Sequence, residues 1–140
     1  MKVLKIYTDG GARGNPGPAA AAFVVIDNEK VIHKDSKFLG KKTNNEAEYE
    51  ALLMALEWLN VNKSSIGDLE LCFYLDSELI VRQLKGLYKV KSRNLKPLAS
   101  KALLLTSKIG NKVEFISVRR ENNKLADSLV NKQLDKVIRS

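Results

Sequence analysis

Cysteine and long apolar runs are both scarce in this sequence. The single cysteine, Cys72, excludes an internal disulfide and any zinc cluster built from cysteines. Its place in the apolar run 69–75 is typical of a buried strand thiol and is compatible with a reducing compartment. No run approaches the ~18 apolar residues of a membrane span, and the N-terminus enters an alternating pattern without the apolar core of a signal peptide. We therefore expect a cytoplasmic protein without membrane contact.

Histidine and acidic residues are also few. The only histidine, His33, lies near the start of an expected strand, where a surface position is favoured over a catalytic role. The chain has 16 Asp and Glu residues against 24 Lys and Arg residues, so its formal net charge is +8. The electrostatic field of a protein with this positive charge attracts polyanions such as nucleic acid. Charge alone does not select a partner, and a basic surface without a specific ligand is the alternative.

The remaining composition is that of an ordinary globular protein. Of the 140 residues, 44% are hydrophobic and 29% are charged, which fits one domain spanning residues 1–140 with a sizeable core. Apolar alternation and short apolar runs predict strands at residues 3–9, 19–26, 31–39, 69–75 and 113–118. Apolar spacing and cap signals predict helices at about 43–62, 77–84, 95–109 and 125–137, with a loop at 10–18 and a linker at 64–68. This order indicates an α/β fold with one mixed sheet and helices packed on it.

The helix predicted over residues 43–62 carries an acid where an apolar residue is expected. At about 100° per residue, Leu52 and Leu59 share the side of the helix on which Glu48 lies, whereas Glu46 lies on the opposite side. A carboxylate on an apolar stripe requires a hydrogen-bond partner, an ion pair or a metal ion. The alternative is a side chain that reaches solvent at the edge of the helix.

Three further acids lie at the ends of predicted elements. Asp9 and Asp76 close the C-terminal ends of two strands, and Asp127 lies near the start of the last helix, whose apolar side includes Leu125. Each acid has a simple structural explanation: turn chemistry for Asp9, helix capping for Asp76 and the helix dipole for Asp127. Four carboxylates close together repel one another, so a group of these three acids and Glu48 is expected chiefly where a protein binds hard cations, Mg²⁺ or Mn²⁺. Paired ions held in this way support phosphodiester cleavage.

A short basic segment follows the second predicted helix. Residues 87–97 contain one aromatic residue, Tyr88, and several cations, among them Lys89, Lys91 and Arg93. The segment is interpreted either as a solvated basic face or as a patch that contacts phosphates.

Four stretches of the sequence stand out by their order and spacing. They are Tyr7-Thr-Asp-Gly-Gly-Ala-Arg-Gly-Asn-Pro-Gly17, Thr43-Asn-Asn-Glu-Ala-Glu-Tyr49, Leu75-Asp-Ser77 and Asn123-Lys-Leu-Ala-Asp127. They resemble the motifs of the ribonuclease HI family over nearly the whole chain. The resemblance implies a ribonuclease H-like fold: a five-stranded mixed sheet of order 3-2-1-4-5 with helices on both faces. It also implies a metal-dependent endonuclease that cuts the RNA strand of RNA/DNA hybrids and leaves 3′-hydroxyl and 5′-phosphate ends.

The resemblance also assigns site residues. The family's metal-binding carboxylates, which hold two Mg²⁺ ions with Mn²⁺ able to substitute, fall on Asp9, Glu48, Asp76 and Asp127. The motif spacing selects Glu48 rather than Glu46. Contacts to the hybrid fall on Gly10, Asn15, Thr43, Asn44, Asn45 and Ser77, and the basic residues Lys89, Lys91 and Arg93 are added as phosphate contacts. Polar groups of this kind are needed to distinguish 2′-hydroxyls across a shallow groove.

The sequence departs from many family members in two places. No histidine follows His33, so the loop histidine that helps product leave in many relatives is missing. Residues 118–123 instead resemble a compact branch found in archaea and some bacteria, in which an arginine stands nearby; Arg120 is favoured over Arg119. Arginine cannot act as a general base at neutral pH, so we expect a phosphate contact or charge stabilisation. The basic protrusion of some relatives is also missing, which is compatible with cleavage of double-stranded RNA.

Two other functions are weighed against this one. The first is a non-catalytic module of the same fold that binds hybrids or duplexes, which the presence of all four acids disfavours. The second is an integrase-like or junction-cutting DNA nuclease, which the Thr43-Asn-Asn45 motif and the Asp9-Gly-Gly11 loop disfavour. In each case we expect a monomer.

Overall fold

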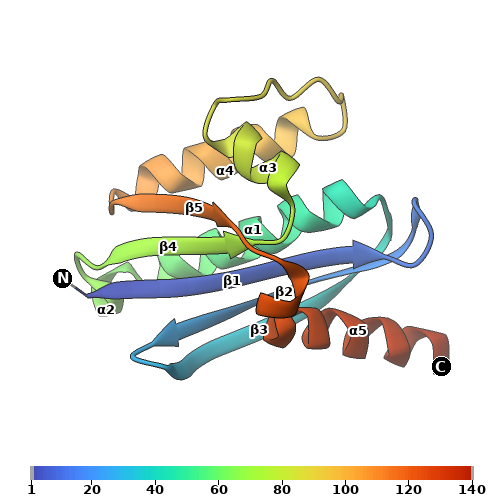
Figure 1. Ribbon diagram of the computed structural model, residues 1–140, viewed down its shortest axis with the longest axis horizontal. Helices are drawn as coiled ribbons and strands as arrows, with labels where there is room; N and C mark the ends of the chain where they lie inside the picture. Colours follow the sequence, from blue (N-terminus) through green and yellow to red (C-terminus); the bar gives the residue numbers. More distant parts are fainter. Residues whose placement is uncertain (1, 140) are drawn as a thin grey trace.

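A computed structural model of the chain describes residues 2–139. Five strands form one mixed sheet in the order β3-β2-β1-β4-β5 (Figure 1). Their bounds are β1 Val3–Ala12, β2 Gly17–Asp27, β3 Lys30–Lys42, β4 Glu70–Leu75 and β5 Val113–Ser117. β1 pairs antiparallel with β2 and parallel with β4, while β3 and β5 form the edges. The predicted fold class and strand order are confirmed.

Helices cover both faces of this sheet (Figure 1). α1 (Asn44–Val61) and α4 (Lys96–Ile109) lie on one face, over the main hydrophobic core, and α5 (Lys124–Arg139) lies on the other. The core beneath α5 is smaller and contains Ala20, Ala22, Val130 and Leu134. The short elements are α2 (Lys63–Ile66), α3 (Glu78–Leu84) and the 3₁₀ turn η1 (Arg120–Asn122). No helix within residues 2–139 combines the length and apolarity needed to cross a membrane.

α1 begins at a complete capping box and packs closely on β1. The Thr43 hydroxyl accepts the backbone N–H of Glu46 at 3.1 Å, and the Glu46 carboxylate accepts the N–H of Thr43 at 3.0 Å. Small residues on the buried side, including Ala47, bring the helix backbone against the strand. A Cβ on Gly10 would lie 2.1 Å from the carbonyl oxygen of Ala47. Only glycine fits at this crossing.

The ends of the first two strands differ from the sequence prediction. β1 continues to Ala12 and β2 begins at Gly17, so the predicted loop 10–18 is reduced to a tight turn. The backbone N–H of Arg13 closes this turn by donating to the carbonyl of Pro18 at 2.9 Å. Glycine-rich sequence favours turns when it is considered locally, but pairing with β2 extends the strand through these glycines.

Three smaller predictions are corrected as well. The predicted linker 64–68 contains most of the one-turn helix α2. Leu125 is 53% exposed, because the side of α5 that faces the sheet consists of other residues, Ala126, Val130 and Leu134. His33 does lie on a strand, but it is half-buried, and its ring stacks on Trp58 with ring centroids 4.6 Å apart.

Candidate active site

The C-terminal ends of β1 and β4 meet at one edge of the sheet. The two strands are parallel neighbours in a register that pairs Tyr7 with Tyr74. Asp9 and Asp76 follow these residues at the same level, so both acids reach the edge where sites form in open α/β sheets. The simple turn explanation for Asp9 is wrong, because Asp9 lies within β1 and is only 5% exposed.

Asp76 does not cap the helix that follows it. The hydroxyl of Ser77 accepts the backbone N–H of Ile80 at 3.3 Å and caps α3 instead. The capping explanation for Asp76 is therefore wrong. Oδ2 of Asp76 lies 3.7 Å from Nε of Arg120. Arg120 is part of η1, so this short element brings a positively charged side chain close to the carboxylates.

Glu48 joins the two aspartates from the first turns of α1. It is only 6% exposed, so the alternative of a side chain that reaches solvent at the helix edge is wrong. Its Oε1 accepts the backbone N–H of Gly10 at 2.9 Å. The other oxygen, Oε2, is buried and has no hydrogen-bond partner anywhere in residues 2–139. Buried polar atoms nearly always have a partner, so Oε2 marks a site that is built for an external group.

The buried carboxyl groups perturb one another. Burial, and after it the charge on Asp76, raises the pKa of Asp9 to about 7. The same two causes, followed by the charge on Asp9, raise the pKa of Glu48 well above its usual range. Burial and like-charge repulsion disfavour the charged forms of Asp9 and Glu48. A bound cation would relieve this repulsion, which favours cation binding.

The cluster fits a divalent cation in its donor atoms and its dimensions. One carboxylate oxygen from each of Asp9, Glu48 and Asp76 lies within 4.8 Å of the other two. Hard cations such as Mg²⁺ take oxygen ligands, and one bound here would also satisfy Oε2 of Glu48. These three residues could hold the ion.

Asp127 approaches the same cluster from α5. It is half-buried, and it acts on Asp9: after burial and Asp76, its charge is a further cause of the raised pKa of Asp9. Its carboxylate is not one of the three that lie within 4.8 Å of one another. The structure therefore brings together all four acids, with Asp127 at the margin.

A cleft of about 430 Å³ opens onto these acids. Its lining includes several residues that sequence motifs predicted: Asp9, Gly10, Asn44, Asn45, Glu48, Asp76, Ser77, Arg120 and Asp127. Residues that were not among the predicted site residues complete the lining: Gly11, Ala12 and Arg13 after Gly10, and Val130, Asn131 and Leu134 of α5. Arg13 is discernible within the glycine-rich motif, but nothing in the local sequence shows that its side chain turns toward a helix near the C-terminus.

Asparagines connect the turn after β1 to the start of α1. Oδ1 of Asn15 accepts the N–H of Asn44 at 3.0 Å, and Oδ1 of Asn44 accepts the N–H of Ala12 at 2.8 Å. A second hollow, of about 390 Å³, adjoins these residues and is lined by Asn15, Thr43, Asn44, Asn45, Ser92, Asn94 and Leu95. Ser92 and Asn94 were not predicted, since the surrounding lysines and arginine dominate that stretch.

The basic segment lies outside the carboxylate cleft. Lys89, Lys91 and Arg93 are exposed and do not line the two hollows described above. The segment is nevertheless anchored: Val90 packs against the main core, and the guanidinium of Arg82 lies over the ring of Tyr88 at 5.3 Å from its centroid. In sequence these cations alternate with or adjoin Ser92 and Asn94, which line the second hollow.

Comparison with known proteins agrees with this geometry. A family profile described as "Reverse transcriptase-like" matches residues 7–133. The chain is 37% identical to a bifunctional protein of Mycobacterium tuberculosis over 100% of its own length, and 35% identical to ribonuclease HI of Halobacterium salinarum over 92%. It spans 37% and 63% of the lengths of those two proteins, less than two thirds of either.

A solved structure shows the same arrangement in three dimensions. The crystal structure of LC11-RNase H1 in complex with an RNA/DNA hybrid superposes with a TM-score of 0.90 at 44% identity, covering 96% of this chain and 99% of that one. Such a likeness extends over the whole sheet and the helices on both of its faces. The chain belongs to the ribonuclease HI family.

Proposed function

We propose that this protein is a metal-dependent endoribonuclease that hydrolyses the RNA strand of RNA/DNA hybrids. The observation that carries the proposal is the triad of Asp9, Glu48 and Asp76 in the lining of an open cleft. Asp9 and Glu48 are buried, and Oε2 of Glu48 lacks a hydrogen-bond partner in the described chain. The net charge of +8 favours a polyanionic substrate. The similar LC11-RNase H1 was solved with a hybrid bound, which supports the same substrate class here.

Each acid has its own part in the proposed reaction. Two divalent ions bound at the cluster, Mg²⁺ with Mn²⁺ able to substitute, would supply the charge that activates water and stabilises the leaving 3′ oxygen. Asp9 and Asp76 would contact both the metal region and the scissile phosphate, and Glu48 would contact one ion and the RNA 2′-hydroxyl. Asp127, at the margin of the cluster, would contact the ion that activates the water. The products carry a 3′-hydroxyl and a 5′-phosphate.

Recognition of the hybrid is assigned to the polar rim. Oδ1 of Asn15 and of Asn44 is engaged within the protein, so the Nδ2 groups are the atoms that face substrate, with Asn45 beside them. Reading of 2′-hydroxyls across a shallow groove needs donors of this kind. Gly10 and Ser77 contribute backbone and hydroxyl contacts at the cleft, and Thr43 contributes a phosphate contact at the second hollow. Lys89, Lys91 and Arg93 contact phosphates farther along the duplex.

We assign Arg120 the role of stabilising the negative charge on the reacting phosphate. Its guanidinium is 80% exposed and lies 3.7 Å from Asp76, so it can move toward a phosphate that enters the cleft. Arginine forms strong charge-assisted hydrogen bonds with phosphate oxygens. Double-stranded RNA is a further substrate that we include, because it shares the 2′-hydroxyls of the hybrid. One chain supplies all four acids, so a monomer suffices.

One gel tests the proposal against its rivals. Labelled RNA/DNA hybrid, double-stranded RNA and double-stranded DNA are incubated with the protein in Mg²⁺ and in EDTA. We expect Mg²⁺-dependent cutting of the RNA strand of the hybrid, with no cutting of DNA. Binding without cleavage would support a non-catalytic module, and cleavage of DNA would support an integrase-like nuclease; either result overturns the proposal. Asp9→Asn that cuts at the wild-type rate would overturn the assigned site.

A further inference from the structure

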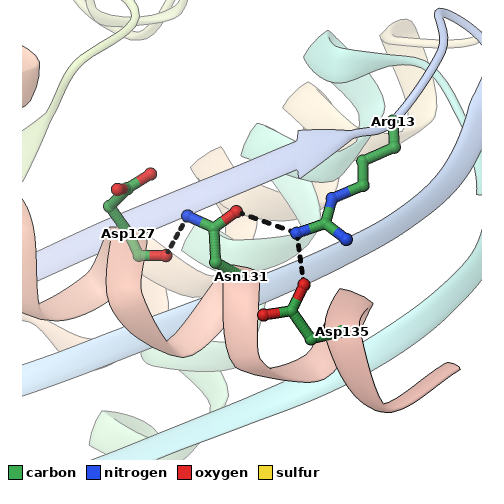
Figure 2. Close-up of polar contacts among 4 residues, drawn as sticks. All are labelled: Arg13, Asp127, Asn131 and Asp135. Atoms are coloured by element: carbon green, nitrogen blue, oxygen red, sulfur yellow. Dashed lines mark hydrogen bonds and ion pairs between the residues drawn. The ribbon is translucent and has the colours of Figure 1, made fainter. Parts of the chain in front are cut away.

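A chain of polar contacts links the turn after β1 to the helix that carries Asp127 (Figure 2). Nη2 of Arg13 donates to Oδ1 of Asp135 at 2.8 Å and to Oδ1 of Asn131 at 3.3 Å. Asn131 in turn donates its Nδ2 to the backbone carbonyl of Asp127 at 3.1 Å. Two hydrogen bonds therefore connect the guanidinium of Arg13 with the backbone of an acid in the cluster.

The turn that carries Arg13 is a firm anchor. The residue follows β1 directly, and its N–H donates to the carbonyl of Pro18 at 2.9 Å. The turn is so tight that a Cβ on Gly17 would lie 2.2 Å from the carbonyl oxygen of Arg13. Because β1 also carries Asp9, any group held by Arg13 is held relative to Asp9.

α5, in contrast, has few other attachments to that strand. The core beneath it is small and consists partly of alanines, which bury little apolar area. At its start, Nδ2 of Asn123 donates to the carbonyl of Thr8 at 2.8 Å. Asp127 thus lies between two links to β1, one at Asn123 and the other at Arg13.

We propose that Arg13 is a positioning residue, which holds α5, and with it Asp127, at the separation from Asp9 that cation binding and cleavage require. The inference rests on the proposed function. Arg13 acts through Asn131 and Asp135 and does not itself ligate the cation. Removal of a residue that holds a metal-binding carboxylate in place without touching the metal changes the affinity for the metal. Arginine suits the role because its planar guanidinium presents several N–H groups in fixed directions.

Arg13 also lines the cleft, so direct contact with a substrate phosphate is the competing role. The two roles make opposite predictions for Asp135. If Arg13 positions α5, removal of Asp135 takes away one of the two contacts by which Arg13 holds the helix, so its effect has the same direction as removal of Arg13. If Arg13 contacts phosphate, removal of Asp135 takes a negative charge away from the substrate path and frees the guanidinium, so that hybrid binding becomes tighter.

The test compares Arg13→Ala, Asp135→Ala and the double variant. Affinity for Mg²⁺ is measured by titration calorimetry without substrate, and kcat and KM are measured on a labelled hybrid. We expect Arg13→Ala to weaken cation affinity and lower kcat by about tenfold, and Asp135→Ala to change both quantities in the same direction, with KM little changed in either variant. The double variant should lose no more than Arg13→Ala, because Asp135 acts on the helix only through Arg13.

Gln133→Ala is the matched control. Nε2 of Gln133 donates to Oγ of Ser36 on β3 at 2.9 Å, so this variant removes a polar link of α5 that does not lead to β1. We expect it to lower the melting temperature without changing cation affinity. Equal loss of cation affinity in Gln133→Ala and Arg13→Ala would overturn the inference, because general loosening of α5 would then explain both.

Other outcomes separate this inference from the proposed function. A raised KM in Arg13→Ala with a lowered KM in Asp135→Ala, at unchanged cation affinity, would identify a phosphate contact and overturn the positioning role. Wild-type protein that binds Mg²⁺ but does not cut the hybrid would overturn the proposed function, while the calorimetry on the variants would still decide the inference. If Arg13→Ala melts below the assay temperature, Arg13→Gln and Asp135→Asn replace the alanine variants.

Discussion

The backbone N–H of Gly10 donates a 2.9 Å hydrogen bond to Oε1 of Glu48. This contact joins the strand that carries Asp9 to the helix that carries the buried acid. The contact engages Oε1 with the backbone. Oε2 has no hydrogen-bond partner in the part of the chain that the structure describes, so it is available to a cation. α1 and β1 therefore meet at Gly10, which allows the close approach of their backbones and also holds the Glu48 carboxylate.

Substitutions should distinguish the buried acid Glu48 from the half-buried acid Glu46. We expect Glu48→Gln to reduce Mg²⁺-dependent cleavage of a hybrid by at least about 100-fold, because an amide is a poor ligand for a hard cation. Glu46→Gln should keep most of the activity, since a glutamine still accepts the N–H of Thr43 in the capping box. Initial rates of both variants give the comparison, and circular dichroism checks the fold. Equal losses would show that the wrong glutamate has been assigned.

The crossing of β1 and α1 predicts a strong effect of one methyl group. Gly10→Ala would place Cβ 2.1 Å from the carbonyl oxygen of Ala47, so one of the two backbones must move. We expect a loss of about 2–4 kcal/mol in the free energy of unfolding, measured by urea denaturation. Gly11→Ala is the control, because its Cβ would meet only a side-chain atom of Val130 at 3.9 Å. Similar stabilities of the two variants would contradict the packing described here.

The raised pKa of Asp9 predicts how the stability of the metal-free protein depends on pH. The pKa of Asp9 is raised to about 7 in the folded protein, above its ordinary value of 3.8. Between these values the unfolded state binds fewer protons than the folded state, so the free energy of unfolding falls as pH rises through this window. Asp9→Asn should therefore raise the melting temperature in EDTA at pH 7.5, by roughly 3–6 °C, and leave it nearly unchanged at pH 4.

Thermal melts across pH 4–8 check this expectation, with Asp68→Asn as a control in an exposed turn. A melting temperature of Asp9→Asn that stays below the wild-type value at pH 7.5 would show that the carboxyl group stabilises the fold, contrary to its burial among like charges.

Cation binding should release protons. Burial and neighbouring carboxylates raise the pKa values of Asp9 and Glu48, so a cation competes with protons for these carboxylates. We expect Mg²⁺ to raise the melting temperature at pH 8 and to have much less effect at pH 5. Calorimetry in two buffers with different ionisation enthalpies measures the protons released. A cation effect that is the same at both pH values would place the binding site elsewhere.

The two neighbouring arginines should differ in function. Arg120 lies 3.7 Å from the Asp76 carboxylate, whereas Arg119 is 84% exposed and has Glu121 as its partner at 4.0 Å. We expect Arg120→Ala to lower kcat by about tenfold through lost charge stabilisation, and Arg119→Ala to change it little. Single-turnover rates on the hybrid measure this difference. A larger loss in Arg119→Ala would reverse the assignment.

Helical periodicity was sufficient to place Glu48 on a buried face, because the burial of one side of a helix follows from 3.6 residues per turn. Local reasoning was less successful at Gly10 and Gly11, where glycines suggested a loop and strand pairing instead extends β1 to Ala12. For Asp76 it left helix capping open as the simple explanation, a role that the adjacent residue Ser77 fills. At the glycines, pairing with a distant strand outweighed the local preference.

The sequence by itself determined which residues could form the site: acids at two strand ends, an acid on an apolar helix face, and an acid near the start of the last helix. These follow from periodicity and end signals, which are local. Only the tertiary structure decided that Asp9 and Asp76 are neighbours, because parallel pairing of β1 and β4 joins segments far apart in the chain. It alone also brought Arg13 to Asp135, 122 residues away, since no local pattern encodes which helix a turn will contact.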